Sequence, residues 1–301
     1  VAGSYFDLLG LDLELQVAHQ NVESFEETLD YFTRRYEGGA GSRLQVTRAD
    51  AALAQVTASI PEIETRITAK ENELSVLLGR PPAGIPRGSS LVEQTMPPQT
   101  PAGLPSALLE RRPDVRAAEQ RVVEANALVG VAVASFLPRI GLTAFWGGAS
   151  TELSQVADPR SRIWSYGASL TAPLFQGGRL LAERRAQIAF WEETVADYQL
   201  TVLGAFADVA TVLDLRQNLA EARVERRREV DALVESVRLS LIRYERGLAS
   251  YYEVLEAQQQ LFPAQIGLAR VRTDEFLALV ALYRALGGGW QLGTTWMPPR
   301  P

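Results

Sequence analysis

The chain contains an internal duplication with a period of 208 residues. Residues 35–79 align with residues 243–287 without a gap, and this register pairs Gly39 with Gly247. Self-similarity over a long period constrains the architecture more than any local motif does. Residue 1 falls opposite residue 209, so the first copy has no counterpart of residues 105–208. The pattern predicts one partial and one complete repeat, in a chain that begins inside its first repeat.

Apolar residues recur seven positions apart on both sides of a glycine-rich turn at residues 38–42. Before the turn they are Leu8, Leu15, Val22, Leu29 and Tyr36, with Leu11, Ala18, Phe25 and Phe32 three positions further on; after it they are Leu53, Ile60, Ile67 and Leu74, with Val56, Ile63 and Leu77. A sustained heptad pattern is typical of helices that pack along a seam. Residues 1–79 are therefore predicted to form an antiparallel helical hairpin about 50 Å long, at ~1.5 Å per residue.

Residues 80–104 contain repeated prolines, which supply no backbone donor, and are predicted to link the two repeats. A helix capped by Ser106 should follow and should end before Pro138. From residue 179 to residue 243 there is no proline, so one helix of roughly 100 Å at ~1.5 Å per residue is expected. A partner helix should return to Leu286, with a kink at Pro263.

Two segments between these helices alternate with a period of two. The first is Ile140–Trp146, and the second begins at Ile163 and places Trp164, Tyr166, Ala168, Leu170, Ala172 and Leu174 on one face, with Ser165, Ser169 and Thr171 on the other. A hairpin over residues 136–175 with this length and pattern fits a membrane-spanning β-barrel, in which Trp164, Tyr166 and Leu170 would face lipid. A soluble hairpin lying on a core is the alternative. Because an isolated hairpin is marginally stable, its attachment to very long, duplicated helices favours a barrel completed by other subunits.

Several function classes are disfavoured by what the sequence lacks. The formal charge of -6 comes from interleaved acidic and basic residues, without the clustered basic face that nucleic acid requires. Paired catalytic carboxylates, a phosphate-binding loop and metal-ligand spacings are not evident, so no catalytic residue, metal or cofactor is predicted, and His19 is interpreted as a surface or packing residue. No run of about 18 apolar residues suggests a transmembrane helix. The chain contains no cysteine.

The order of several short motifs resembles one known family. They are Leu104-Pro105-Ser106 with Arg111-Arg112-Pro113-Asp114-Val115-Arg116-Ala117-Ala118-Glu119, Phe136-Leu137-Pro138-Arg139, Ala172-Pro173-Leu174-Phe175-Gln176-Gly177-Gly178, Arg243-Tyr244-Glu245-Arg246-Gly247 and Leu282-Tyr283-Arg284-Ala285-Leu286-Gly287. Together they resemble the outer-membrane factor family, the TolC/OprM-type channels of Gram-negative efflux pumps, and most closely its lipid-anchored OprM-type branch. The resemblance covers essentially the whole chain.

This resemblance implies an α+β membrane protein with an internal duplication. Long antiparallel coiled-coil helices would form an α-barrel across the periplasm, and three chains would share a 12-stranded transmembrane β-barrel in outer-membrane lipid. The complete second repeat would be residues 105–290, followed by a tail at 291–301. Part of the first repeat, with a signal peptide and a lipidated cysteine, would precede residue 1. The implied partners are two further copies of the chain, a periplasmic adaptor protein and an inner-membrane transporter, which normally selects the substrate.

The same resemblance assigns roles to residues at the two turns. Gly39, Ala40, Gly247 and Leu248 would dock the adaptor protein at the periplasmic tips. Tyr244, Tyr252, Glu253 and Glu256 would form the constriction, where each glutamate becomes a ring of three that favours cations. Ala249 departs from the pattern, since TolC-type members carry an arginine there, so the pairs that lock the gate must differ. A solvated acidic patch after a turn is the structural alternative.

The predicted function is that of the exit duct of a tripartite pump that exports drugs or other small molecules, which would contribute to antibiotic resistance. A duct for type I protein secretion or for metal efflux is the first alternative. A coiled-coil scaffold with a β-hairpin tip is the second, and it explains the heptads but not the strand alternation.

Overall fold

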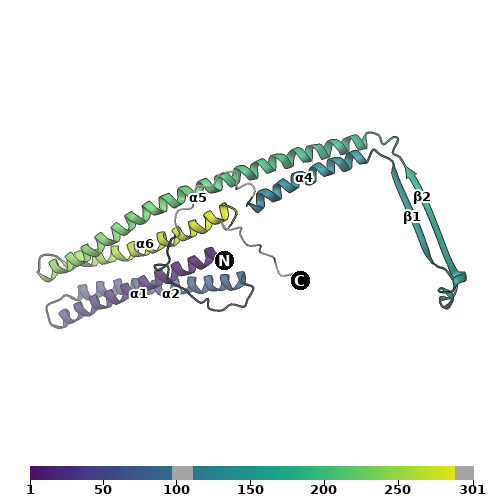
Figure 1. Cartoon of the computed structure of the whole chain (residues 1–301). Helices are drawn as coiled ribbons and strands as arrows, with labels where there is room; N and C mark the ends of the chain where they lie inside the picture. Colours follow the sequence, from purple (N-terminus) through teal and green to yellow (C-terminus); the bar gives the residue numbers. More distant parts are fainter. Residues whose placement is uncertain (97–110, 289–301) are drawn as a thin grey trace. The chain divides into compact units, whose positions relative to one another are not determined.

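The computed structural model describes residues 1–96 and 111–288 and divides into two compact units. One unit comprises the described residues within 1–104 and 207–301, and the other those within 105–206. In chain order the elements are α1 (Ala2–Glu37), α2 (Arg43–Leu77), α4 (Pro113–Ala134), β1 (Arg139–Gly148), β2 (Arg162–Thr171), α5 (Arg179–Glu245) and α6 (Tyr251–Ala285), with two short 3-10 helices in the β1–β2 loop (Figure 1).

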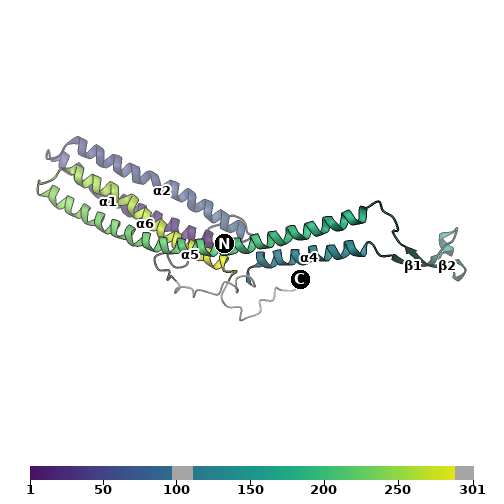
Figure 2. The same ribbon diagram turned by 90° about the horizontal axis from the view of Figure 1, so that it is seen from above.

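The first unit consists of two helical hairpins, α1 with α2 and the later part of α5 with α6. Helix α1 packs against both α2 and α6, and the two hairpins lie side by side along these faces (Figures 1 and 2). The heptad prediction is confirmed for Phe25, Phe32, Val56 and Ile63, which are buried. It is wrong for Tyr36 and Leu77, which are 45% and 50% exposed; Leu77 is the last residue of α2 and points away from the cluster in which Leu74 packs against Leu8 of α1.

Both helices that follow a turn continue through a proline. Pro61 lies inside α2 and Pro263 lies inside α6, and the residues on either side of each are helical. Helix α2 begins with a capping box, in which the Ser42 hydroxyl accepts a bond from the Gln45 amide while the Gln45 side chain accepts one from the Ser42 amide. This reciprocal cap explains why the helix starts immediately after the glycine turn.

The part of the predicted linker that the structure describes, residues 80–96, packs against the helical unit. Ile85 and Leu91 are buried in two small apolar clusters with residues of α1, α2 and α6. The Arg87 guanidinium donates to Asp12 on α1 at 2.9 and 3.1 Å and to Glu71 on α2. The segment is therefore anchored to the helices by both apolar and ionic contacts.

The second unit joins α4 and the first part of α5 to the β-hairpin. The predicted cap Ser106 lies outside the described residues; within them α4 begins at Pro113, a first-turn position that suits proline because its missing amide would be unbonded anyway. The Arg112 guanidinium donates to the Ala205 carbonyl of α5 at 3.5 Å. Helix α5 has 67 residues, which confirms the prediction of one unusually long helix.

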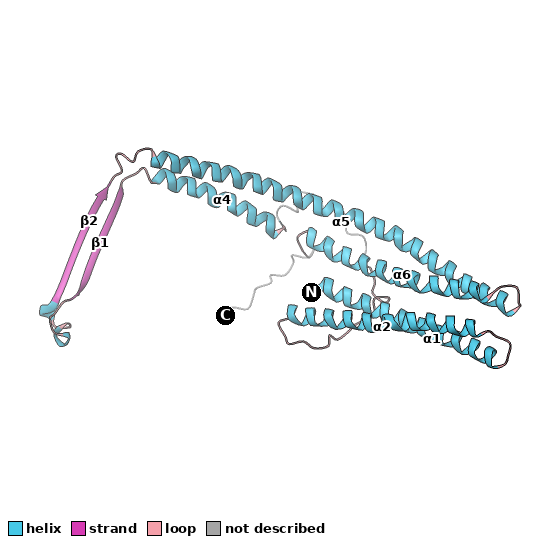
Figure 3. Ribbon diagram, turned by 180° about the vertical axis from the view of Figure 1, so that it is seen from behind, coloured by secondary structure: helices cyan, strands magenta, loops and turns pink. Residues whose placement is uncertain are grey.

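Strands β1 and β2 form an antiparallel two-stranded ribbon (Figure 3). The register pairs Ile140 with Leu170 and Trp146 with Trp164, so the alternating apolar residues of both strands share one face. The prediction that the alternation continues to Leu174 is wrong. β2 ends at Thr171, opposite the first residue of β1, so no partner strand remains, and Pro173 has no amide to donate.

Candidate functional site

The two turns at the ends of the helical hairpins have nearly the same backbone conformation. Gly39 has φ of 73° and Gly247 has φ of 71°, which confirms that both glycines adopt the left-handed conformation disfavoured for other residues. The next residues, Ala40 and Leu248, are exposed at the tips, and Leu248 retains 66% of its surface. Each turn therefore presents a small or apolar side chain to solvent.

An arginine of the preceding helix braces each turn. Arg35 donates from Nη2 to the Ala40 carbonyl at 3.3 Å, and Arg243 donates from Nη2 to the Leu248 carbonyl at 3.4 Å. The two copies then differ. The Arg35 guanidinium lies over the ring of Tyr244, 5.3 Å from its centroid, whereas Arg243 Nε lies 3.5 Å from Glu253 Oε2.

The polar residues predicted for the constriction lie together at the start of α6. Tyr252 is 58% exposed, and the side chains of Glu253 and Glu256 are exposed too. A groove of about 500 Å³ between α5 and α6 is lined by these two glutamates, Glu235 and Arg243. Arg243 was not predicted as the ionic partner of Glu253, although the two residues lie on either side of the same turn.

The duplication clarifies how this acidic face arises. Glu253 occupies the position that Gln45 holds in the first repeat, and Glu256 the position of Arg48. Gln45 completes a capping box, whereas the cap residue before α6 receives no side-chain bond, so Glu253 is free to reach Arg243. One repeat uses the position to cap a helix, and the other presents a carboxylate.

Tyr244 lies inside an aromatic cluster and not on the exposed face. The aromatic cluster consists of Tyr31, Phe32, Tyr244 and Tyr251, which join α1, α5 and α6. Tyr244 is 9% exposed, and its hydroxyl accepts a bond of 3.4 Å from Gln45 of α2. Tyr244 therefore connects the two hairpins near their tips.

Tyr251 is a member of the aromatic cluster that the sequence analysis did not single out. Its ring centroid lies 3.9 Å from that of Phe32, and the residue is 4% exposed. Burial raises the pKa of its hydroxyl to about 12. The heptad pattern of the sequence indicates this burial, because it places residue 251 on the core side of α6 and Tyr252 on the outer side.

The β-hairpin presents one continuous apolar face. Trp164, Tyr166 and Leu170 are 63%, 80% and 71% exposed, and the rings of Trp164 and Tyr166 stack with centroids 5.6 Å apart. Ser165 and Ser169 lie on the opposite face, across from Phe145 and Gly141. Such a surface can be buried only by lipid or by another chain.

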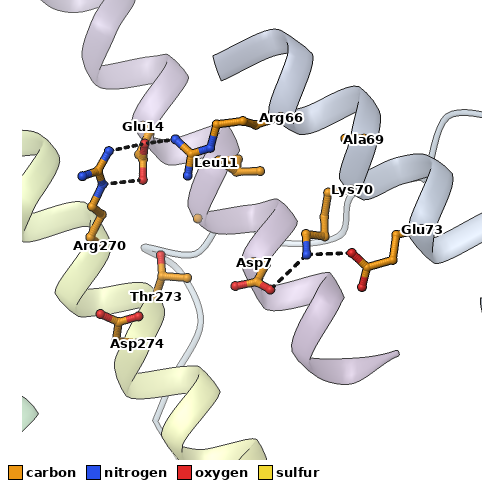
Figure 4. A pocket seen from close by; sticks show the side chains of 11 residues that line it. Asp7, Leu11, Glu14, Arg66, Ala69, Lys70, Glu73, Arg270, Thr273 and Asp274 are labelled. Atoms are coloured by element: carbon orange, nitrogen blue, oxygen red, sulfur yellow. Dashed lines mark hydrogen bonds and ion pairs between the residues drawn. The ribbon is translucent and has the colours of Figure 1, made fainter. Parts of the chain in front are cut away.

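A charged cluster lies at the end of the helical unit remote from the turns, around a cleft of about 530 Å³ (Figure 4). Glu14 of α1 is 4% exposed and lies between two guanidinium groups, with Arg66 Nη1 and Arg270 Nε each 3.0 Å from one of its oxygens. Lys70 bridges Asp7 at 3.4 Å and Glu73 at 2.8 Å. This cluster was not predicted from the sequence, because Glu14 lies beside an apolar heptad position.

Helix α5 passes a length-and-composition test for a membrane span. It contains an 18-residue window with mean hydropathy of 1.2, of which 6% is buried, so by length and composition alone it could cross a membrane, although the window is not an uninterrupted apolar run. Helices that pack inside a protein can have the same length and hydropathy, and such a window can include up to two charged residues. Within residues 1–96 and 111–288, no group of three or more histidine or acidic side chains is placed to hold a metal ion.

Comparisons with known proteins agree on one family. The family model described as outer membrane efflux protein matches residues 1–80 and 104–288. The chain is 33% identical to the pyoverdine export outer membrane protein OpmQ of Pseudomonas putida, over 97% of this chain and 62% of that protein. It is 30% identical to the cation efflux system protein CusC of Escherichia coli O6:H1, over 97% of this chain and 63% of that protein.

A solved structure gives the same result for the fold. The outer-membrane channel OprN superposes with a TM-score of 0.83 at 31% identity, over 96% of this chain and 65% of that chain. The chain thus spans somewhat less than two thirds of the length of these proteins.

Proposed function

Because the chain belongs to the outer membrane efflux protein family, we propose that it is part of the outer-membrane exit channel of a tripartite efflux pump. The observation that carries this proposal is the family match over both repeats, together with a ribbon whose one face is entirely apolar. The combination fits a duct that is lipid-embedded at one end and helical at the other. A passive duct of this kind does not require any catalytic group.

The channel would be built from three copies of the chain. A two-stranded ribbon has two open edges and cannot be stable in lipid alone, because unpaired backbone groups there are costly. Copies of the chain, together with the strands expected in the other repeat, would close these edges into a barrel. The expected pump partners are a periplasmic adaptor at the tips around Ala40 and Leu248 and an inner-membrane transporter.

Tyr252, Glu253 and Glu256 would form the narrowest point of this duct. All three side chains are exposed, Glu253 and Glu256 line one groove, and threefold symmetry would turn each glutamate into a ring of negative charge. Arg243 would moderate the charge at Glu253. The duct would therefore favour cations over anions while remaining tolerant of diverse cargo.

A duct for metal efflux is a second candidate, supported by the 30% identity to a cation efflux protein. The exported compound would be selected by the inner-membrane transporter in either case. Two measurements test the proposal: fractionation of cells that express the complete gene product, and the accumulation of a fluorescent pump substrate or of a metal cation in a deletion strain. We expect the protein in the outer-membrane fraction and raised accumulation of one substrate class. Recovery in the soluble fraction without detergent would favour the coiled-coil scaffold instead.

A further inference from the structure

A polar pocket lies where the β-hairpin joins the helices of the second unit. Its volume is about 280 Å³, and its polar lining residues are Ser135, Arg139, Thr171, Gln176, Arg179 and Glu183. All of them belong to the same compact unit. Because a water molecule occupies about 30 Å³ in the liquid, the pocket has room for the charged group of a small organic compound. We refer to it as the junction pocket.

The chain reverses between β2 and α5, and this turn brings two polar side chains of the junction pocket together. Gly177 and Gly178 supply the turn with left-handed φ values of 56° and 85°. Gln176 Oε1 accepts bonds from Arg179 Nε at 3.3 Å and from Arg179 Nη2 at 3.1 Å. The carboxamide is thereby held with its oxygen toward the arginine. Its NH2 group, which has two N–H donors, makes no hydrogen bond to a residue that the structure describes.

The Arg139 guanidinium is the charged group of the junction pocket that has no partner within the described residues. It forms neither a hydrogen bond nor an ion pair with any of them, although a guanidinium carries five N–H donors. The Thr171 hydroxyl, opposite Arg139 in the strand register, likewise makes no hydrogen bond inside the described part of the chain. Two neighbouring donor groups therefore remain available to a ligand.

The charge balance of the junction pocket favours an anionic ligand. Glu183 is the acidic side chain among the lining residues, and it is already paired, with Arg179 Nη1 3.2 Å from Glu183 Oε2. Two guanidinium groups and one carboxylate leave an excess of one positive charge. Carboxylate and phosphate groups accept paired N–H bonds from a guanidinium, so an oxyanion matches both the charge and the geometry of these donors.

The strand register places the junction pocket on the polar face of the hairpin. Arg139 pairs with Thr171, and the next pair, Ile140 with Leu170, belongs to the exposed apolar face. Side chains alternate between the two faces of a strand, so Arg139 and Thr171 lie on the face opposite to that of Leu170. In the proposed channel the polar face surrounds the duct. The ligand would then reach the pocket from the duct and not from lipid, a step that rests on the proposed function.

We propose that the junction pocket binds the carboxylate or phosphate group of an anionic compound in the duct, with Arg139 as its main ligand. Thr171, Gln176 and Arg179 complete the set of donors, and Glu183 competes with the ligand for Arg179. Three copies of the chain would place three such pockets where the strands give way to helices.

The junction pocket acts independently of the acidic groove between α5 and α6. The two lie at opposite ends of α5, a helix of 67 residues. At ~1.5 Å per residue this helix is roughly 100 Å long, whereas salt screens exposed charges beyond about 8–10 Å. A preference for cations at the groove is therefore compatible with the binding of anions at the junction.

Titration of the complete gene product in lipid nanodiscs with benzoate and with methyl phosphate, followed by saturation-transfer NMR, tests the proposal. We expect saturable binding of both anions and none of tetramethylammonium. Arg139→Gln should weaken the binding roughly tenfold, because charge-assisted bonds are lost. Arg121→Gln, which alters an exposed arginine of α4, should leave the affinity unchanged. Equal affinities in the wild-type protein and in Arg139→Gln would overturn the proposal.

Glu183→Gln provides a second test, which a loss of folding cannot imitate. Without the competing carboxylate, Arg179 Nη1 becomes available to the ligand, so benzoate should bind several-fold more tightly. An unchanged or lower affinity in correctly assembled protein would contradict the proposed set of donors.

Two comparisons separate the junction pocket from a lipid site and from the proposed channel. Replacing zwitterionic nanodisc lipid by phosphatidylglycerol should leave benzoate binding unchanged after correction for the negative surface potential. Loss of binding would assign the pocket to a lipid headgroup and overturn the proposal. Anion binding by protein that conducts no ions would count against the channel alone. Normal conduction without saturable anion binding would count against the pocket alone.

Discussion

At the scale of single residues, the buried Glu14 of α1 joins three helices through its ion pairs with Arg66 of α2 and Arg270 of α6. Its side chain is 6% exposed and receives bonds from Arg66 and Arg270, whose side chains are 51% and 59% exposed. Glu14→Gln should lower the free energy of unfolding by about 1–3 kcal/mol, because the two arginines lose a charged acceptor that is shielded from water. Thermal unfolding followed by circular dichroism measures this. Glu23→Gln, at an exposed position of the same helix, should have little effect, and equal losses in the two variants would contradict the assignment.

The anchor of residues 80–96 should depend on pH through Glu71. The Arg87 hydrogen bond holds the pKa of this carboxyl below its usual range. A lowered folded-state pKa means that the stabilisation is present above the unfolded value of about 4.3 and is lost as the pH falls further. Hydrogen exchange at the Ile85 amide, which donates to Glu71 at 3.3 Å, should accelerate over this range after correction for intrinsic rates. Glu71→Gln should abolish the transition, and a transition that persists in that variant must have another origin.

The polar residues of the helical core could be predicted only in part from the sequence. The seven-residue spacing of Glu14, Asn21 and Thr28 was visible, but their partners on α6 are more than 200 positions away and follow from packing alone. Tyr251 and Tyr252 are adjacent and chemically identical. Their positions around α6 differ by one residue, so Tyr251 is buried and Tyr252 is exposed. A short sequence motif does not distinguish the two.

At the scale of elements, the β-hairpin allows a direct test of which strand face contacts lipid. Leu170 and Ser169 are neighbours on β2 and point to opposite faces. Leu170→Arg should reduce assembly more than Ser169→Arg on the lumen side, because a charge on the lipid face costs up to about 2–4 kcal/mol at mid-bilayer and less toward the strand ends. The measurement is the yield of folded trimer in outer membranes. Equal assembly of the two variants would show that the lipid-facing assignment of Trp164, Tyr166 and Leu170 is wrong.

The two turns are predicted to act as docking elements as well as chain reversals. Bulky polar substitutions at Ala40 or Leu248 keep Gly39 and Gly247, so the left-handed turns should persist. We expect normal trimers that export less substrate and recover less adaptor protein in pull-down experiments. Val92→Gln, which alters a half-exposed apolar side chain of the linker, serves as the control. Unchanged export in the turn variants would exclude docking at these positions.

The elements themselves were largely predictable, for physical reasons that differ between them. The long helix α5 follows from the absence of proline over its length, and the turns follow from glycine. The end of β2 at Thr171 was not predictable from alternation, because a strand ends where its partner ends. The packing of residues 80–96 also escaped prediction, since Arg87 is bonded to side chains on two different helices.

At the scale of the whole molecule, the central claim is that copies of this chain surround a pore whose constriction lies at Tyr252, Glu253 and Glu256. The exposed apolar ribbon and the family match support a membrane channel, and the acidic groove between α5 and α6 supports the position of the gate. Two glutamates in each of three chains would concentrate negative potential along the axis. Their effect on permeation should exceed that of any other exposed carboxylates on the helices.

Ion conduction by the complete gene product in planar lipid bilayers tests this claim most directly. The wild-type protein should give discrete conductance steps with a preference for cations. Glu253→Gln with Glu256→Gln should reduce that preference, and Tyr252→Ala should raise the resting conductance because it removes the bulky group at the constriction. Glu225→Gln with Glu229→Gln, two exposed carboxylates in the middle of α5, should leave both properties unchanged. Inserted protein that conducts no ions in any variant would contradict the channel, and conduction unaffected by the α6 substitutions would contradict this location of the gate.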